Sequence, residues 1–220
     1  MENYVSNFFD TLITATEQQR KEFQQIETLQ KGSTGDISLQ TYQAFLTQAY
    51  HHVKHTTPLL MSCGGRIPQD KEWLRNAIAE YIEEELGHQE WILNDITATG
   101  INAEQVRYGQ PSPATELMVA YAYDLIMRVS PMGFFGMVLV LEGTSIALAS
   151  NAAGKIQEKL SLPDSAFSYL TSHGSLDIEH MGFYETLMNK VTDKDDQEVI
   201  IHAANMFYKL YGDIFRTLPV

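Results

Sequence analysis

The amino-acid sequence predicts an all-α protein built as one bundle of about seven to nine helices. Apolar residues recur at intervals of three and four along most of the chain, which is the spacing of helices with one buried face. No stretch alternates between apolar and polar residues over the length of a strand. A chain of 220 residues can bury a sizeable core without a second unit, so residues 1–220 are expected to form a single domain.

The first half of the chain divides at its glycines and prolines. An apolar stripe near the N-terminus is interrupted by the Gly-Ser-Thr-Gly run at 32–35, and a second helix is expected to begin near Asp36 or Ser38. Residues 57–65 contain a proline and a glycine pair and are interpreted as a turn. A long helix is expected to follow over residues 70–96.

The second half continues in the same manner. Residues 98–113 hold two glycines and two prolines and are interpreted as a loop, with Ser112 and Pro113 opening the next helix. Further helices are expected over residues 114–129, 132–158, 163–174, 177–191 and from 195 to about 210.

Composition excludes several classes of function. The net charge of -13 argues against nucleic acid or an anionic membrane as partner, because both require clustered Lys and Arg. A single cysteine, Cys63, excludes an internal disulfide and suggests a reducing compartment. The N-terminus lacks a signal-peptide pattern, so the cytoplasm is the expected location. The apolar segment 132–154 is interrupted by Glu142 and is interpreted as a buried helix, not a membrane span.

Three segments carry residues suited to metal binding. Glu85 and His88 are three residues apart and follow an inward apolar stripe; on one helix they would share a face, and Glu84 would lie beside it. Glu142 is the only charge in the sixteen residues 134–149, and a buried carboxylate must be paired, neutralised or bound to metal. A solvated run of glutamates beside a core histidine, and a hydrogen-bonded structural Glu142, remain the simpler alternatives.

The third segment supplies His173, Asp177 and His180. They occupy positions i, i+4 and i+7, which form one stripe if the helix runs through Gly174. An Asp177 that caps a helix beside two surface histidines is the alternative. Chance alone gives about one acid-x-x-His pair in this composition, so the context of the pairs carries the argument.

Together these residues predict a carboxylate-bridged site for two metal ions. Imidazole and carboxylate ligands with open positions favour Fe(II), with Mn as an alternative, whereas structural zinc more often uses thiolates. The histidine-rich run 50–55 offers a further candidate ligand, His52, which lies near the apolar face of its predicted helix.

The order Glu85-x-x-His88, Glu142, His173-x-x-x-Asp177-x-x-His180 resembles that of the haem-oxygenase-like diiron oxidases, the iron-containing redox enzymes of the TenA, PqqC and haem oxygenase superfamily. The resemblance spans roughly residues 38–210. It implies a haem-oxygenase-like helical bundle and assigns the six motif residues as metal ligands. Relatives with this fold often form homodimers, and the sequence leaves the oligomeric state open.

The chain departs from the family pattern in one respect. No carboxylate lies on an early helix in the expected place, so His52 or Glu84 would have to complete the second metal site. No histidine precedes His51, which argues against a haem oxygenase, and Cys63 lies too early in the chain for the nucleophile of a thiaminase-type TenA enzyme.

The sequence therefore predicts a non-haem diiron oxidase or oxygenase that uses O2 to oxidise a small organic substrate in a buried cavity. Tyr81 and Tyr184, each about one helical turn from a predicted ligand, are the candidate catalytic residues. The main alternative is a metal-free TenA- or PqqC-like protein that binds or transforms a small heterocycle, such as a thiamin- or quinone-related compound. An interaction protein with a vestigial cavity is the third hypothesis.

Overall fold

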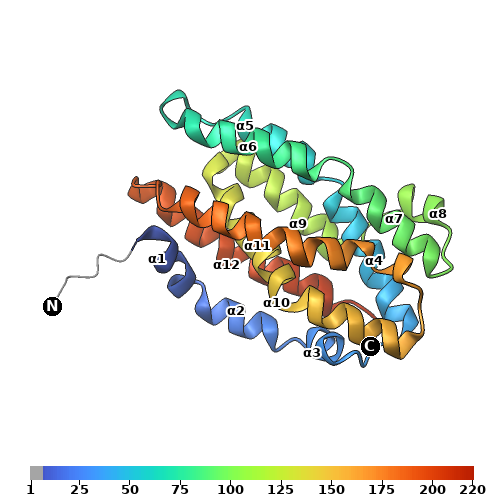
Figure 1. Cartoon of the computed structure of the whole chain (residues 1–220). Helices are drawn as coiled ribbons and strands as arrows, with labels where there is room; N and C mark the ends of the chain where they lie inside the picture. Colours follow the sequence, from blue (N-terminus) through green and yellow to red (C-terminus); the bar gives the residue numbers. More distant parts are fainter. Residues whose placement is uncertain (1–6) are drawn as a thin grey trace.

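Every regular element between residues 7 and 220 of the computed structural model is helical (Figure 1). The structure describes the backbone of these residues, and the side chains of all but 147–151 and 173–179. The helices are α1 Phe8–Ala15, α2 Glu17–Gln24, α3 Glu27–Thr34, α4 Leu39–Val53, α5 Thr56–Gly64, α6 Glu72–Glu85, α7 His88–Ala98, α8 Ala103–Arg107, α9 Pro113–Asp124, α10 Phe134–Leu160, α11 Ser168–Met188 and α12 Lys194–Arg216.

The all-α prediction is confirmed, and several helix boundaries fall where their caps predict. Ser38 accepts a hydrogen bond from the Thr41 backbone N–H at the start of α4. Ser112 accepts a hydrogen bond from the Thr115 backbone N–H at the start of α9, and Pro113 occupies the first turn of this helix. The polar N-cap side chain satisfies a backbone donor that the helix itself leaves unpaired.

Other expected boundaries were wrong. The apolar stripe near the N-terminus lies on three short helices, α1 to α3, and not on one. Residues 57–64 belong to α5, and Gly65 is its C-cap; Pro58 lies in the first turn of this helix, where no backbone N–H is needed. The loop 98–113 contains α8, and the expected helix 114–129 ends in a π-helical turn over Leu125–Val129.

Two further corrections concern the segments with candidate ligands. The helix expected over 70–96 is broken between α6 and α7, at Leu86 and Gly87. The two helices expected over 163–174 and 177–191 are one continuous helix, α11, that passes through Gly174. A glycine inside a helix costs only about 1 kcal/mol, which packing can offset.

α10 is the centre of the bundle, packed between α11 and α12 (Figure 1). It approaches α12 closely at Gly136, where an added Cβ would lie 2.6 Å from the backbone nitrogen of Ala204 and 2.7 Å from the carbonyl oxygen of Ile200. Only glycine permits this approach. The contact fixes how deeply α10, and with it Glu142, lies in the bundle.

A hydrogen-bonded carboxylate joins α7 to the start of α11. Asp95 is fully buried, and its side chain accepts hydrogen bonds from the backbone N–H groups of Ser168, at 3.1 Å, and Tyr169, at 2.8 Å, and from the Ser168 hydroxyl. Burial raises the pKa of Asp95, while these hydrogen bonds act in the opposite direction. Asp95 therefore caps a helix that lies 73 residues away in sequence.

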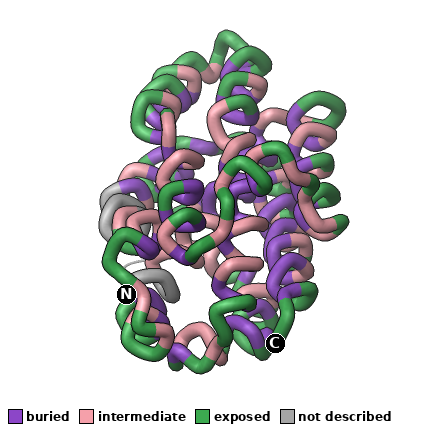
Figure 2. The backbone as a smooth tube through the Cα atoms, turned by 90° about the vertical axis from the view of Figure 1, so that its right-hand side faces the viewer, coloured by how far each residue is buried: buried purple, intermediate pink, exposed green. Residues whose placement is uncertain are grey.

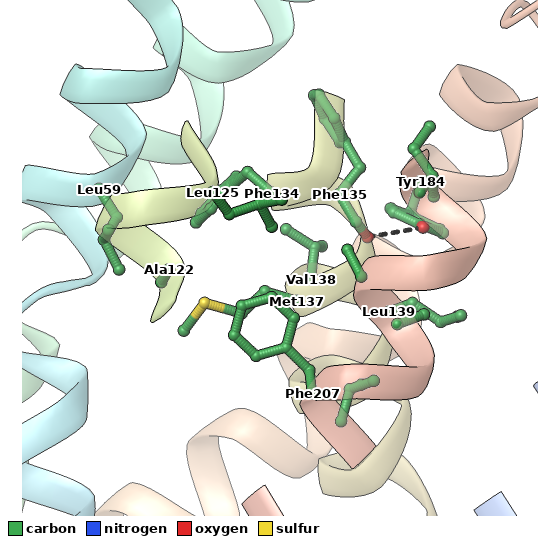
Figure 3. Close-up of a cluster of buried hydrophobic side chains, with 14 of the residues drawn as sticks. Leu59, Ala122, Leu125, Phe134, Phe135, Met137, Val138, Leu139, Tyr184 and Phe207 are labelled. Carbon is green, nitrogen blue, oxygen red and sulfur yellow. Dashed lines mark hydrogen bonds between the residues drawn. The ribbon is translucent and has the colours of Figure 1, made fainter. Parts of the chain in front are cut away.

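Apolar side chains fill the interior between the helices, and buried backbone lies towards the middle of the bundle in Figure 2. One cluster joins the start of α10 to α11 and α12, where the Tyr184 hydroxyl donates a hydrogen bond to the Phe135 carbonyl oxygen at 2.8 Å (Figure 3). A second cluster packs α4 and α7 against the end of α10. Within residues 7–220, no helix is long and apolar enough to cross a bilayer.

The close approach at Gly136 predicts opposite effects for two glycines of α10. Gly136→Ala should destabilise the protein by about 1–3 kcal/mol, because the new methyl group would meet backbone atoms of α12. Gly154→Ala should be neutral or stabilise by up to about 1 kcal/mol, because its Cβ would meet nothing within 4 Å. Denaturant unfolding of both variants measures the difference, and equal stabilities would contradict the packing described.

Asp95→Asn should destabilise the protein by about 1–3 kcal/mol, because an amide N–H2 group would replace one acceptor oxygen and face backbone donors. Asp36→Asn is the matched control, since the Asp36 side chain is largely exposed. The midpoint of urea unfolding is the measurement. A shift no larger than that of the control would show that Asp95 does not stabilise the start of α11.

Candidate functional site

Glu85 and His88 meet across the break between α6 and α7. Glu85 is the last residue of α6 and His88 the first of α7, and both are buried. Gly87 has a φ of 93°, in the left-handed region that glycine adopts readily, and it redirects the chain. The intervening Leu86 is 61% exposed. Carboxylate and imidazole still lie 3.1 Å apart, so the pair forms through a turn and not, as the spacing suggested, along one helix face.

His180, on α11, links two other helices. Its Nε2 atom lies 2.9 Å from a carboxylate oxygen of Glu84, on α6, and its Nδ1 atom lies 3.8 Å from a carboxylate oxygen of Glu142, on α10. The Glu142 side chain is 13% exposed and does not face bulk solvent. Glu84 adjoins Glu85 in sequence. The contacts of His180 and the Glu85–His88 pair therefore bring residues of α6, α7, α10 and α11 close to one another.

His173 and Asp177 have side chains outside the described residues, so their positions stay predictions. The backbone settles one question about them. α11 is continuous from Ser168 to Met188, so the condition for one stripe of His173, Asp177 and His180 is met.

Tyr81 packs within this group. Its ring lies edge-on to the imidazole of His180, with centroids 5.7 Å apart. The residue is 3% exposed, and its hydroxyl has no hydrogen-bond partner among the described side chains. Burial is the main cause that raises the pKa of Tyr81, and the charge of Glu142 raises this pKa further. The phenol is therefore a protonated, buried donor beside carboxylates.

Tyr184 has a different environment. Its hydroxyl already donates to the Phe135 carbonyl, and its ring packs against Phe9. Burial raises the pKa of Tyr184 well above its ordinary value, with Glu142 adding to the shift. The residue fastens α11 to α10, as Figure 3 shows, and it does not line the cavity described next.

A largely apolar cavity of about 180 Å³ adjoins the carboxylates. Glu85, Glu142 and His52 all line it, and His52 is buried with its ring edge-on to Tyr211. Sequence reasoning missed most of the remaining wall, although the spacing of Tyr42, Phe45, His52 and Val53 on α4 and of Tyr211 and Phe215 on α12 could have shown it.

The atoms offered at this place are ligand types common to iron, manganese and zinc. They are carboxylate oxygens and imidazole nitrogens, and the single thiol lies elsewhere. The 3.8 Å between His180 and Glu142 exceeds a hydrogen bond but fits two ligands of one ion, which with bonds of about 2.1 Å stand about 3.0–4.2 Å apart. Within the described side chains, no group of three or more His, Cys, Asp or Glu residues is arranged to hold one ion.

A family model described as iron-containing redox enzyme matches residues 43–212. The chain belongs to this family. The match includes His180 with its neighbours Glu84 and Glu142, the contacting pair Glu85 and His88, and also His173 and Asp177. A comparison with curated proteins found no match.

Solved structures share the fold of this chain. A protein of unknown function with a haem oxygenase-like fold from Shewanella denitrificans superposes with a TM-score of 0.84 and 19% identity, over 97% of this chain and 92% of that one. A TenA homologue from Pseudomonas syringae gives 0.80 and 14%, over 96% and 91%. Haem oxygenase-1 from Synechocystis, in complex with haem, gives 0.76 and 13%, over 97% and 92%. These likenesses establish the haem oxygenase-like fold.

Cys63 is expected to be unreactive in the folded protein. Its thiol is buried and donates to the Pro131 carbonyl oxygen, and burial raises its pKa to about 12. At pH 8 only about one thiol in ten thousand would ionise. Labelling with a thiol reagent at pH 8 should therefore proceed only after denaturant is added. Rapid labelling of native protein would contradict this and restore Cys63 as a candidate nucleophile.

Proposed function

We propose that this member of the iron-containing redox enzyme family is a non-haem diiron oxidase or oxygenase, with O2 and a small organic molecule as substrates. The observation that carries the proposal is the convergence of Glu84, Glu85, His88, Glu142 and His180 from four helices beside a cavity. Glu84 is half exposed, but Glu85, His88, Glu142 and His180 are largely buried, which is costly unless a cation compensates for it.

The proposed ligands are Glu85, His88, Glu142, His173, Asp177 and His180, with His52 or Glu84 completing the second position. Two iron ions held by such residues would supply the electrons and the open coordination positions that O2 activation requires. Mn could occupy the same donors, and metal analysis distinguishes the two.

The protein's own groups have separate tasks in this proposal. The Tyr81 hydroxyl would donate a hydrogen bond to a group at the site, because it is protonated and has no partner among the described residues. His52, Glu85 and Glu142 face the cavity, so a bound molecule would lie beside them. The apolar wall would exclude water around the reacting groups. Tyr184, whose hydroxyl holds the Phe135 carbonyl, is reassigned to support of the site.

A metal-free TenA-like function is the second candidate. It is supported by the TenA fold likeness and by His52, Glu85 and Glu142, which could act as acid and base groups around a small heterocycle. The buried, protonated thiol of Cys63 weighs against the thiaminase-type version of this candidate.

Anaerobic titration of the full chain with ferrous iron tests the proposal. About two iron ions per chain should bind, and exposure to air should then be accompanied by O2 consumption. Glu142→Ala should lower bound iron to about half or less and abolish O2 consumption. Iron content by absorption spectroscopy and O2 uptake by electrode are the measurements.

Two exposed residues provide matched controls. Glu116→Ala, on α9, and His202→Ala, on α12, remove the same side-chain types from the surface and should leave iron binding unchanged. Wild-type protein that binds less than about half an iron per chain would overturn the diiron proposal and favour the metal-free candidate.

A further inference from the structure

The helix α3 forms one wall of the cavity and has its opposite face in solvent. The helices α1, α2 and α3 run along one edge of the bundle, with α3 packed against α10 (Figure 1). Thr28 and Leu29 are buried and line the cavity, together with the partly exposed Gly32 and Ser33. Most other lining residues lie on the longer helices α4, α10 and α12. The exposed residues of α3 are Glu27, Gln30 and Thr34. A single short helix thus separates this part of the cavity from the surrounding solvent.

The sequence of α3 gives this helix little stability of its own. It has eight residues, Glu27–Thr34, whereas isolated helices shorter than about 12–15 residues are marginal in water. Its last turn contains Gly32, Ser33 and Thr34, which all favour the helix less than alanine does. Ile26, at the N-cap position, has an apolar side chain that cannot satisfy the free backbone N–H groups of the first turn. Packing against the rest of the bundle must therefore keep α3 in place.

The chain is held firmly on both sides of α3. Phe23 is buried, and its ring stacks on that of Tyr211, on α12, with centroids 5.6 Å apart. Ile26 packs over Gly212, where an added Cβ would lie 3.0 Å from the Ile26 Cδ1 atom. On the other side, α4 begins with the cap that Ser38 provides. Local unfolding of α3 would therefore leave α2 and α4 in their places.

The end of α3 is joined to α10 through Lys155. The Lys155 ammonium donates a hydrogen bond to the Ser33 carbonyl oxygen at 2.9 Å, in an exposed position. Gly35, with a φ of 78°, lies against the same residue, since an added Cβ would be 2.8 Å from the Lys155 carbonyl oxygen. Water competes for an exposed hydrogen bond, so its net contribution to stability is modest. The bond to Ser33 can therefore open without disturbing the contacts of Phe23 and Ile26.

We propose that α3 is a movable cover of the cavity, which opens by local unfolding between Ile26 and Ser38 and lets small molecules enter and leave. Elements that gate a binding site come from the least stable parts of a fold, and α3 is such a part. The inference goes beyond the proposed function, because it concerns access to the cavity. It applies to a diiron oxidase and to a metal-free TenA-like protein alike.

Thiol labelling of the full chain tests the inference without any ligand or metal. Ala152→Cys places a thiol in the cavity wall, and Val138→Cys is a second reporter there. Methyl methanethiosulfonate is added at pH 8, at concentrations where labelling follows the population of the open form, and mass spectrometry measures the rate. The native Cys63 is buried and is not among the described residues that line the cavity, so it reports global unfolding. Each introduced thiol should label at least about tenfold faster than Cys63.

Further substitutions in the Ala152→Cys protein locate the opening. Gly32→Ala should slow labelling about fivefold, because alanine favours the helix and its Cβ would meet nothing within 4 Å. Gly182→Ala, at an exposed position on α11, is the matched control and should leave the rate unchanged. Lys155→Met removes the hydrogen bond to α3 and should speed labelling about twofold to fivefold, whereas Lys209→Met, on α12, should not.

The inference is overturned if Gly32→Ala and Lys155→Met leave labelling unchanged, since the cavity then opens elsewhere. It is also overturned if Gly182→Ala slows labelling as much as Gly32→Ala does, or if Cys63 reacts as fast as the introduced thiols, since the opening is then global. Urea unfolding checks that each reporter protein is folded. Iron binding does not enter the measurement, so a failure of the diiron proposal leaves this result unaffected, and the reverse also holds.

Discussion

The structure depends on the burial of carboxylates inside a helical bundle. Glu85 and Glu142 lie in an interior whose other walls are mainly apolar, and such groups need compensation. The neighbours supply it with imidazoles: His88 lies against Glu85, and His180 lies between Glu84 and Glu142. A metal ion bound among these groups would compensate the carboxylates further.

The relative positions of the helices decide whether these groups meet. Gly136 sets the depth of α10 against α12, Asp95 ties α7 to the start of α11, and the Tyr184 hydroxyl ties α11 to α10. Tyr42 adds a fourth restraint, because its hydroxyl donates to the Ala166 carbonyl oxygen just before α11. None of these residues is among the proposed ligands, yet each fixes a helix that carries one. A shift of about 1 Å in any of them would separate ligand atoms whose bonds to a metal are only about 2 Å long.

The sequence predicted the class of fold and the principal residues of the site, but local patterns could not predict every boundary. Glu142 was identified because a lone charge in an apolar run is physically anomalous. Gly87 and Gly174 show which helix boundaries local sequence patterns cannot predict. Both lie in acid-and-histidine segments, yet the chain breaks at Gly87 and remains helical through Gly174. A glycine permits either result, so packing between distant segments decides. The Asp95 cap was missed for the same reason, since its partners lie more than seventy residues away.

The fold by itself does not select a reaction. Proteins described as a TenA homologue and as a haem oxygenase superpose on almost the whole chain at 13–14% identity, so shared topology accommodates different chemistry. The side chains, and not the fold, distinguish the candidate functions. The buried Cys63 thiol, which donates a hydrogen bond to a backbone carbonyl oxygen, is a poor nucleophile. The carboxylates and imidazoles that α6, α7, α10 and α11 bring together are groups that can bind metal ions. The family match agrees with that donor set, and the metal content of the protein therefore discriminates between the candidate functions more sharply than any further comparison of folds.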